Sequence, residues 1–119
     1  MAREITASAS LTASKGGASV SASAAITNDM AGDQMLTNVQ NIGTSAEALV
    51  LGDITTIGFL FVKNLDATNY VEVDSVNTLD EFPQKLLPGE FVLLKPQTTT
   101  IYAKANTAAC NVLVQAVEL

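Results

Sequence analysis

The stretch Ile101–Glu118 reads IYAKANTAACNVLVQAVE, and it decides the fold class of this chain. Its first part, Ile101–Ala105, is expected to be a strand, and Asn106 and Thr107 then supply a turn. Apolar residues occupy every second position from Cys110 to Ala116, which predicts a second strand. Its side chains divide between two faces, with Val112, Val114 and Ala116 on one and Leu113 and Val117 on the other. The stretch therefore predicts neighbouring strands of a sheet.

Similar short runs precede this stretch and are separated by turn residues such as Pro88-Gly89. They predict strands over Met35–Ile42, Glu47–Leu51, Phe59–Val62, Tyr70–Val73 and Phe91–Leu94. Regular spacing of short strands favours an all-β protein, an antiparallel β-sandwich or a jelly-roll-like barrel. Phe59–Val62 is almost wholly apolar, so we expect this strand to be buried on both faces and to form a hairpin with Tyr70–Val73. Thr44–Leu49 is the best helix candidate, with room for one or two turns.

The N-terminal part has a different composition. Ala, Ser, Thr and Gly make up 19 of residues 1–27, and all six aromatic residues lie between Phe59 and Tyr102. Apolar and polar residues alternate strictly from Ile5 to Ser14, and again after Lys15-Gly16-Gly17, which is typical of two strands joined by a tight turn. We expect residues 1–33 to form an extended β-hairpin arm with its linker and residues 34–119 to form the sandwich body.

Folding the arm about its turn predicts which residues face each other. Large would meet large and small would meet small, in the pairs Ile5 with Ile26, Leu11 with Val20, Ala7 with Ala24 and Ala9 with Ala22. An isolated hairpin is marginal in water, and an Ala methyl contributes only about 0.8 kcal/mol on burial. The arm therefore has to dock on the body, a neighbouring copy or another protein, unless it is a disordered tail. The predicted interaction residues are Ile5, Leu11, Val20 and Ile26.

The composition excludes several kinds of chemistry. The chain has six Lys plus Arg, twelve Asp plus Glu, a net charge of −6, one Cys and no His or Trp. Without His, neither an imidazole metal site nor a Ser–His nucleophile pair can form, and a single Cys excludes an intramolecular disulfide and a Cys-cluster zinc site. So acidic a chain is a poor nucleic-acid binder. We expect no cofactor, with Cys110 as a small buried hydrophobe.

The remaining acidic pairs predict no active site. Asp80 and Glu81 are adjacent in a loop, while Glu72 and Asp74 share a strand face that we expect to be solvated. Asp29-to-Asp33 falls short of a calcium loop, so no metal is expected. The N-terminus lacks the apolar stretch of a secretory signal, and no window has the roughly 20 apolar residues of a membrane helix. An enzyme is the least favoured class, and neither nucleic acid nor membrane is an expected partner.

Three segments carry a resemblance to a known family: LGDITTIGFLFVKNLDATNYVEV at Leu51–Val73, KLLPGE at Lys85–Glu90 and IYAKAN at Ile101–Asn106. Together they resemble small β-sandwich structural proteins of tailed bacteriophages, over roughly residues 40–119. The likeness is a pattern of strands and turns with no catalytic signature. It implies a virion component made in the host cytoplasm.

Within that family, the arm favours a capsid cement or decoration protein on the outer capsid surface. Such proteins are typically homotrimers that bridge neighbouring major capsid protein subunits, so the implied partners are the major capsid protein and further copies of this chain. A tail or head–tail junction protein is the first alternative. A carbohydrate-binding or adhesive β-sandwich, with Tyr70 or Tyr102 as a sugar platform, is an alternative from another class.

Overall fold

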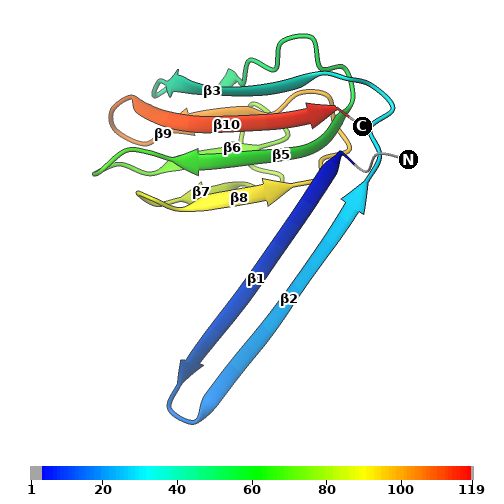
Figure 1. Ribbon diagram of the computed structural model, residues 1–119. Helices are drawn as coiled ribbons and strands as arrows, with labels where there is room; N and C mark the ends of the chain where they lie inside the picture. The colour runs from blue at the N-terminus through cyan, green and yellow to red at the C-terminus, as the bar shows by residue number, and fades with distance from the viewer. Residues whose placement is uncertain (1–3, 119) are drawn as a thin grey trace. The chain divides into compact units, whose positions relative to one another are not determined.

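The computed structural model describes residues 4–118; Met1–Arg3 and Leu119, which belong to the predicted arm and body ranges, lie outside the described residues. The chain divides into two compact units, with the boundary between Ala31 and Gly32. All the regular structure of residues 4–118 is β-strand and turn, and no helix occurs there (Figure 1). The all-β prediction is confirmed.

The first unit is an antiparallel β-hairpin of two strands, β1 (Ile5–Lys15) and β2 (Ala18–Asn28). Gly16 and Gly17 form the whole loop, with φ of 60° and 86°. Positive φ at both central residues is what a type I′ turn requires, and Gly adopts it without a Cβ clash. The predicted hairpin and its turn are therefore confirmed.

The predicted pairing within the hairpin is wrong by two residues. The two-residue loop pairs Lys15 with Ala18, so that Ala7 faces Ile26 and Ala9 faces Ala24. Each large residue consequently faces a small or polar one: Ile5 faces Asn28, Leu11 faces Ala22 and Val20 faces Ala13. Turn geometry sets the register of a hairpin, and here it overrides the matching of side-chain sizes. A shift of two leaves every side chain on its predicted face.

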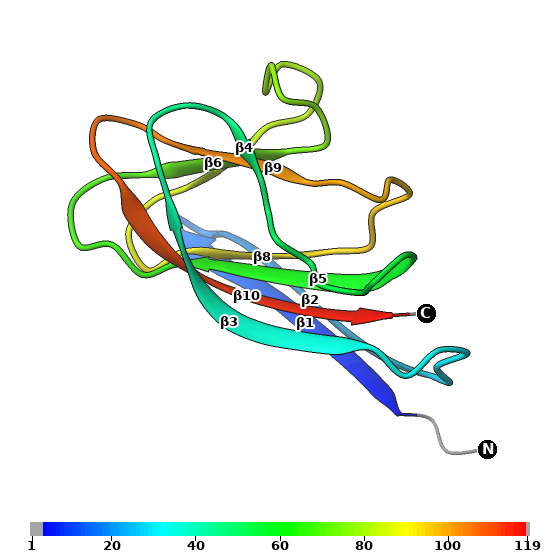
Figure 2. The ribbon, with the colours of Figure 1, turned by 90° about the horizontal axis from the view of Figure 1, so that it is seen from above.

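The second unit is a sandwich of two four-stranded antiparallel sheets. One sheet has the strand order β3-β10-β5-β8 and the other has β4-β9-β6-β7, and Figure 2 shows the two layers. The strands are β3 (Met35–Ile42), β4 (Glu47–Ala48), β5 (Ile57–Asn64), β6 (Val71–Asp74), β7 (Gln84–Leu86), β8 (Phe91–Leu94), β9 (Tyr102–Ala105) and β10 (Cys110–Glu118).

Successive strands of the sandwich alternate between the sheets at every connection except β6–β7. Eight antiparallel strands in this order form a jelly roll, so the β-sandwich prediction is confirmed. The predicted hairpin of Phe59–Val62 with Tyr70–Val73 is wrong, because β5 pairs with β10 and β8 whereas β6 pairs with β7 and β9. A turn between two apolar runs does not distinguish a hairpin from a crossover between sheets.

The core lies between the two sheets. Inward positions of β5, β6, β9 and β10 are almost fully buried, and Ile42, Leu86 and Ile101 close the core around them. The central side chains are Leu60, Val62, Val71, Val73, Ala103, Ala105, Cys110, Val112, Val114 and Ala116. This contiguous core is what allows the second unit to fold around its own side chains.

Three further predictions in the body need correction. Thr44–Leu49 contains no helix; only Glu47 and Ala48 are regular, as the two-residue strand β4. The predicted strand over Glu47–Leu51 is accordingly shorter, because Leu49 and Leu51 reach the core from an irregular segment. The sequence also predicts a polar loop over Asp74–Gln84 and no strand after it, whereas strand β7 begins at Gln84. Its three residues are too few to show a periodic pattern.

Candidate interaction surfaces

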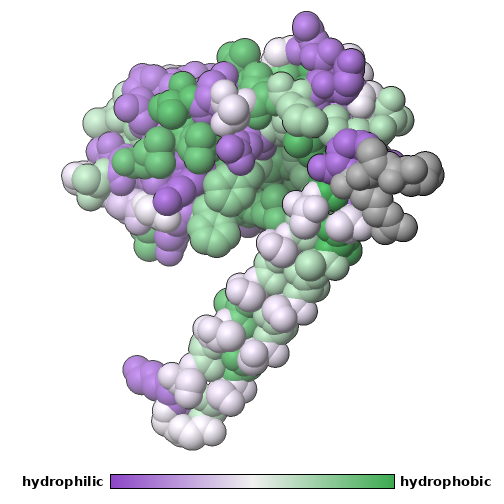
Figure 3. Space-filling view, viewed as in Figure 1, coloured by the Kyte–Doolittle hydropathy of each residue, from purple (hydrophilic) through white to green (hydrophobic). Residues whose placement is uncertain are grey.

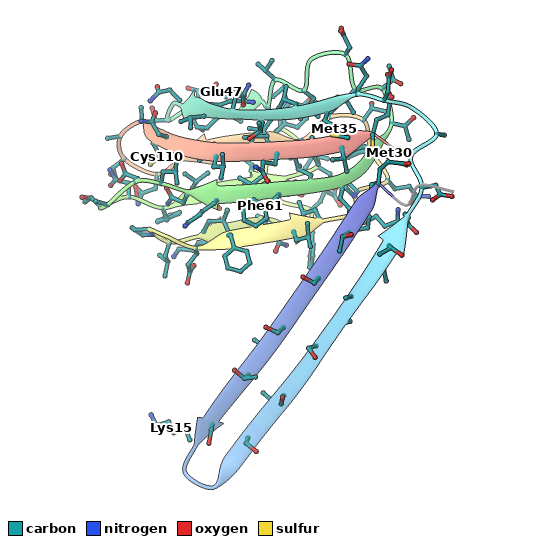
Figure 4. All side chains as sticks on the ribbon, viewed as in Figure 1. Lys15, Met30, Met35, Glu47, Phe61 and Cys110 are labelled. Atoms are coloured by element: carbon teal, nitrogen blue, oxygen red, sulfur yellow. The ribbon has the colours of Figure 1, made fainter. Side chains whose placement is uncertain are left out.

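The hairpin presents two chemically different faces. Hydroxyl side chains from both strands share one face with Ala25, and apolar side chains make most of the other. The apolar face contains Ile5, Ala7, Ala9, Leu11 and Ala13 from β1 and Ala18, Val20, Ala22, Ala24 and Ile26 from β2. Lys15, at the tip in Figure 4, is the only charged residue between Ile5 and Asn28. A ribbon with so little charge is suited to contact rather than to chemistry.

The four predicted interaction residues lie on this apolar face, and three of them are exposed. Leu11 is 68% exposed, Val20 59% and Ile26 48%, whereas Ile5 is only 5% exposed. Most other positions of both strands are also exposed. Figure 3 shows the hairpin as a pale ribbon with green side chains at its surface. The hairpin thus lacks a core of its own.

A second apolar surface lies on the body, on the outward side of the β3-β10-β5-β8 sheet. The strand registers place Val39, Leu113, Lys63 and Phe91 in one row and Met35, Val117 and Phe59 in another, with Thr37, Gln115, Phe61 and Leu93 between them. We call these eleven residues the outer sheet face. Phe91 and Met35 are each 62% exposed and Val39 is 56% exposed.

The outer sheet face corrects one expectation and was missed by sequence reasoning. Phe59–Val62 was expected to be buried on both sides, but only Leu60 and Val62 are buried, while Phe59 and Phe61 are half-buried. The Phe61 and Phe91 rings stack with their centroids 5.6 Å apart, and Lys95 Nζ lies 4.9 Å from the centre of the Phe59 ring. The sequence did carry a signal for this face, because β5 and β10 have apolar residues on both of their sides. They indicate either a second buried layer or an exposed apolar face.

The opposite sheet has a polar outward side. Glu72 of β6 lies between Lys85 of β7 and Lys104 of β9 in the register, which places opposite charges side by side. Opposite charges on neighbouring strands attract each other. Lys85 Nζ also lies 4.3 Å from the centre of the Tyr70 ring. The two outward sides of the sandwich are therefore unlike, one apolar and one charged.

Two of the buried or loop carboxylates, those of Asp74 and Asp66, accept hydrogen bonds from backbone N–H groups of the loops. Asp74, which was expected to be solvated beside Glu72, is instead buried at the end of β6. Its Oδ1 accepts a hydrogen bond from the Ser75 backbone N–H at 2.6 Å, and its Oδ2 accepts from Glu81 at 3.0 Å and Phe82 at 3.1 Å. The carboxylate thus fixes the loop between β6 and β7. This role of Asp74 depends on the positions of backbone N–H groups, which no sequence motif predicts.

Asp66 plays the same part in the β5–β6 connection. Its Oδ2 accepts backbone hydrogen bonds from Asn69 at 2.6 Å and Thr68 at 2.9 Å. These two N–H groups lower the pKa of Asp66 from its ordinary value of 3.8, and the N–H of Asn69 has the larger effect.

Among residues 4–118 no group of three or more acidic, Cys or His side chains is placed to hold a metal ion.

Cys110 lies in the core at the start of β10, as predicted for a small buried hydrophobe. Burial, followed by the charge of Asp66, raises the pKa of its thiol above the ordinary value. A thiol that stays protonated is a poor nucleophile.

Comparison with protein-family models, with curated proteins and with solved structures finds no match to this chain. Within residues 4–118 there is also no helix of the length and apolar character needed to cross a membrane. The two apolar surfaces, the hairpin face and the outer sheet face, are therefore the features from which a function can be argued.

Proposed function

We propose that this protein is a non-enzymatic virion structural component, a capsid cement or decoration protein that bridges and stabilises neighbouring major capsid protein subunits. The observation that carries the proposal is the exposed Ala- and Ser-rich hairpin attached to a jelly-roll body. Such a ribbon gains its stability on assembly, because alone it buries too little apolar surface to offset its ordering.

The body is compatible with the same role. Jelly rolls occur in viral capsid and lectin domains, so the architecture supports the proposal by analogy only. The resemblance of Leu51–Val73, Lys85–Glu90 and Ile101–Asn106 to phage sandwich proteins adds to it. In this proposal the body makes the contacts of a homotrimer, and the arm bridges adjacent subunits through its exposed residues Leu11, Val20 and Ile26, next to the buried Ile5.

Copy number tests the place in the virion. Particles are purified from cells that carry the gene, and this chain is quantified by mass spectrometry against the major shell protein. Hundreds of copies per particle support the outer shell, since a shell repeats its lattice many times. About six to a few dozen copies would place the protein in the tail or at the head–tail junction instead. Absence of the chain from purified particles would overturn the proposal.

A pair of full-length variants tests the arm. Val20→Asp puts a charge on the apolar face of β2, whereas Ser19→Asp puts the same charge on its hydroxyl face. We expect Val20→Asp to lower the incorporation of the chain into particles about tenfold or more, and Ser19→Asp to leave it nearly unchanged. Equal incorporation of both variants would show that the apolar face of the hairpin is not the bridging surface.

The carbohydrate-binding alternative needs an open aromatic platform. The Lys85 ammonium lies over the Tyr70 ring and Tyr102 is half-buried, so both tyrosine rings are partly covered. A glycan screen in which Tyr70→Ala or Tyr102→Ala abolished binding would nevertheless favour this class over the structural role.

A further inference from the structure

We infer that the outer sheet face is the docking site for the hairpin of a second copy of this chain, so that each copy donates one arm and receives one. The inference rests on the proposed function only in taking the arm as a bridging element. It names the neighbour that the arm reaches. The chain carries two exposed apolar surfaces of matching kind, and arm exchange would cover both in one contact.

The shapes of the two surfaces complement each other. Phe59, Phe61 and Phe91 give the outer sheet face large side chains, while the apolar face of the hairpin consists mostly of Ala with a few larger residues. Stacked sheets pack about 10 Å apart when their side chains interdigitate, and small side chains on one side leave room for rings on the other. A hairpin with large side chains on its docking face could not approach the outer sheet face as closely.

The dimensions also agree. A two-stranded ribbon of 11-residue strands is about 35 Å long and about 10 Å wide, so one face covers about 350 Å². The four strands of the receiving sheet span a greater width than this ribbon, and β10, with nine residues, is about 30 Å long. The three rows of the outer sheet face span about 14 Å along β10, so a hairpin lying along this strand covers the face and also the polar row of Asn41 and Asn111 beside it.

The area favours exchange over the simpler pairings of two copies. A chain that gives one arm and receives another buries about 700 Å², which is close to the 800 Å² or so per partner in a standard stable interface. Arm-to-arm packing would bury only about 350 Å² per chain and leave the outer sheet face uncovered. Sheet-to-sheet packing would leave the arm uncovered. A reciprocal dimer places both arm contacts in one interface, whereas a closed trimer has one arm contact of about 350 Å² per partner in each of its interfaces.

The charges do not oppose this contact. Lys15 is the single charge of the hairpin, and the residues from Gly32 to the C-terminus include ten acidic and four basic residues. The contact therefore brings one positive side chain to a body that is acidic as a whole, although the cations Lys63 and Lys95 lie on and beside the outer sheet face. Lys63 is the one charged residue of the outer sheet face, and it lies in the row of Phe91 rather than at the centre of the face.

Sedimentation velocity of the purified full chain, without any particles, tests the exchange. We expect an oligomer at micromolar concentration. Leu11→Asp on the arm and Val39→Asp on the outer sheet face should each weaken self-association about tenfold or more. The matched controls Ser10→Asp and Asn38→Asp change exposed neighbours on the same strands and should leave it unchanged. Circular dichroism confirms that each variant keeps its β-structure.

Cross-linking identifies the surfaces directly. Full chains with and without ¹⁵N are mixed, treated with an amine-reactive cross-linker and digested. We expect links from Lys15 to Lys63 or Lys95 that join a labelled chain to an unlabelled one. Links of this kind confined to single chains would overturn the inference, because the arm would then dock on its own body.

Other outcomes are equally decisive. A monomeric full chain, or an oligomer that Leu11→Asp disrupts and Val39→Asp does not, would also overturn the inference. None of these results depends on particles. A chain that exchanges arms but is absent from virions would refute only the proposed function, and a monomer that is abundant in virions would refute only the exchange.

Discussion

The hairpin and the sandwich use the same kind of secondary structure with opposite results. In β10 alternate residues are buried to near completion, whereas in β1 a comparable alternation leaves most side chains exposed. The difference is the size of the apolar residues and the presence of a second layer. Val and Leu on two facing sheets make a core, while Ala on one ribbon does not. Alternation predicts a strand, but burial depends on what faces it.

The largest expected effect is on the free energy of unfolding, and it compares a leucine of the sandwich with a leucine of the hairpin. Leu60 is fully buried in β5 and Leu11 is 68% exposed in β1. Leu60→Ala should lower the free energy of unfolding of the sandwich by about 2–5 kcal/mol, since it leaves a cavity. Leu11→Ala should change it by less than about 0.5 kcal/mol. Urea unfolding followed by circular dichroism measures both. Equal losses would mean that the arm belongs to the cooperative core.

The next effect separates two aspartates of the body. Asp74→Ala removes the acceptor for the backbone N–H groups of Ser75, Glu81 and Phe82 and should cost about 2 kcal/mol, because hydrogen bonds to a charged group are among the stronger ones. Asp80→Ala is the control, since Asp80 is exposed and accepts a hydrogen bond from the Thr78 hydroxyl. A similar loss in both variants would contradict the assignment of Asp74 as the loop anchor.

A smaller effect is confined to the hairpin. Gly17→Ala places a Cβ at φ of 86°, where nothing lies within 4 Å, so the cost is conformational and about 1 kcal/mol. Gly16→Asn is the matched change, because Asn tolerates the left-handed region. Hydrogen exchange of residues 5–28 should accelerate in Gly17→Ala and change little in Gly16→Asn. The thermal unfolding of the body should be the same in both. A change in the unfolding temperature of the body would show that the two units do not unfold independently.

The smallest effect is a dependence on pH. The pKa of Asp66 is lower in the folded chain than the ordinary 3.8, so its ionised form stabilises the fold above that value and this contribution disappears as the pH falls through the folded pKa. Asp66→Asn removes the titration. The stability difference between wild type and Asp66→Asn should therefore be largest near neutral pH and shrink in acid. Urea titrations from about pH 6 to about pH 2.5 measure it, and a difference that grows in acid would be the contrary result.

Much of the fold was accessible from the sequence because its signals are local. The hairpin follows from alternation and from its turn at Gly16 and Gly17, and the strands Met35–Ile42 and Phe91–Leu94 follow from short apolar-rich runs bounded by turn residues. The pairing partner of Phe59–Val62, the burial of Asp74 and the strand β7 were not accessible. Each depends on residues distant in the chain that the fold brings together.

The candidate surfaces divide in the same way. The sequence by itself determined the apolar face of the hairpin, Ile5, Leu11, Val20 and Ile26 included, because side chains of a strand alternate whatever the strand packs on. Only the tertiary structure decided that Phe59, Phe61, Leu113 and Val117 point outward and are half-buried rather than fully buried. Alternation along a strand does not say whether another layer covers either side of it. Covering is a property of neighbouring sheets, and no local pattern encodes it.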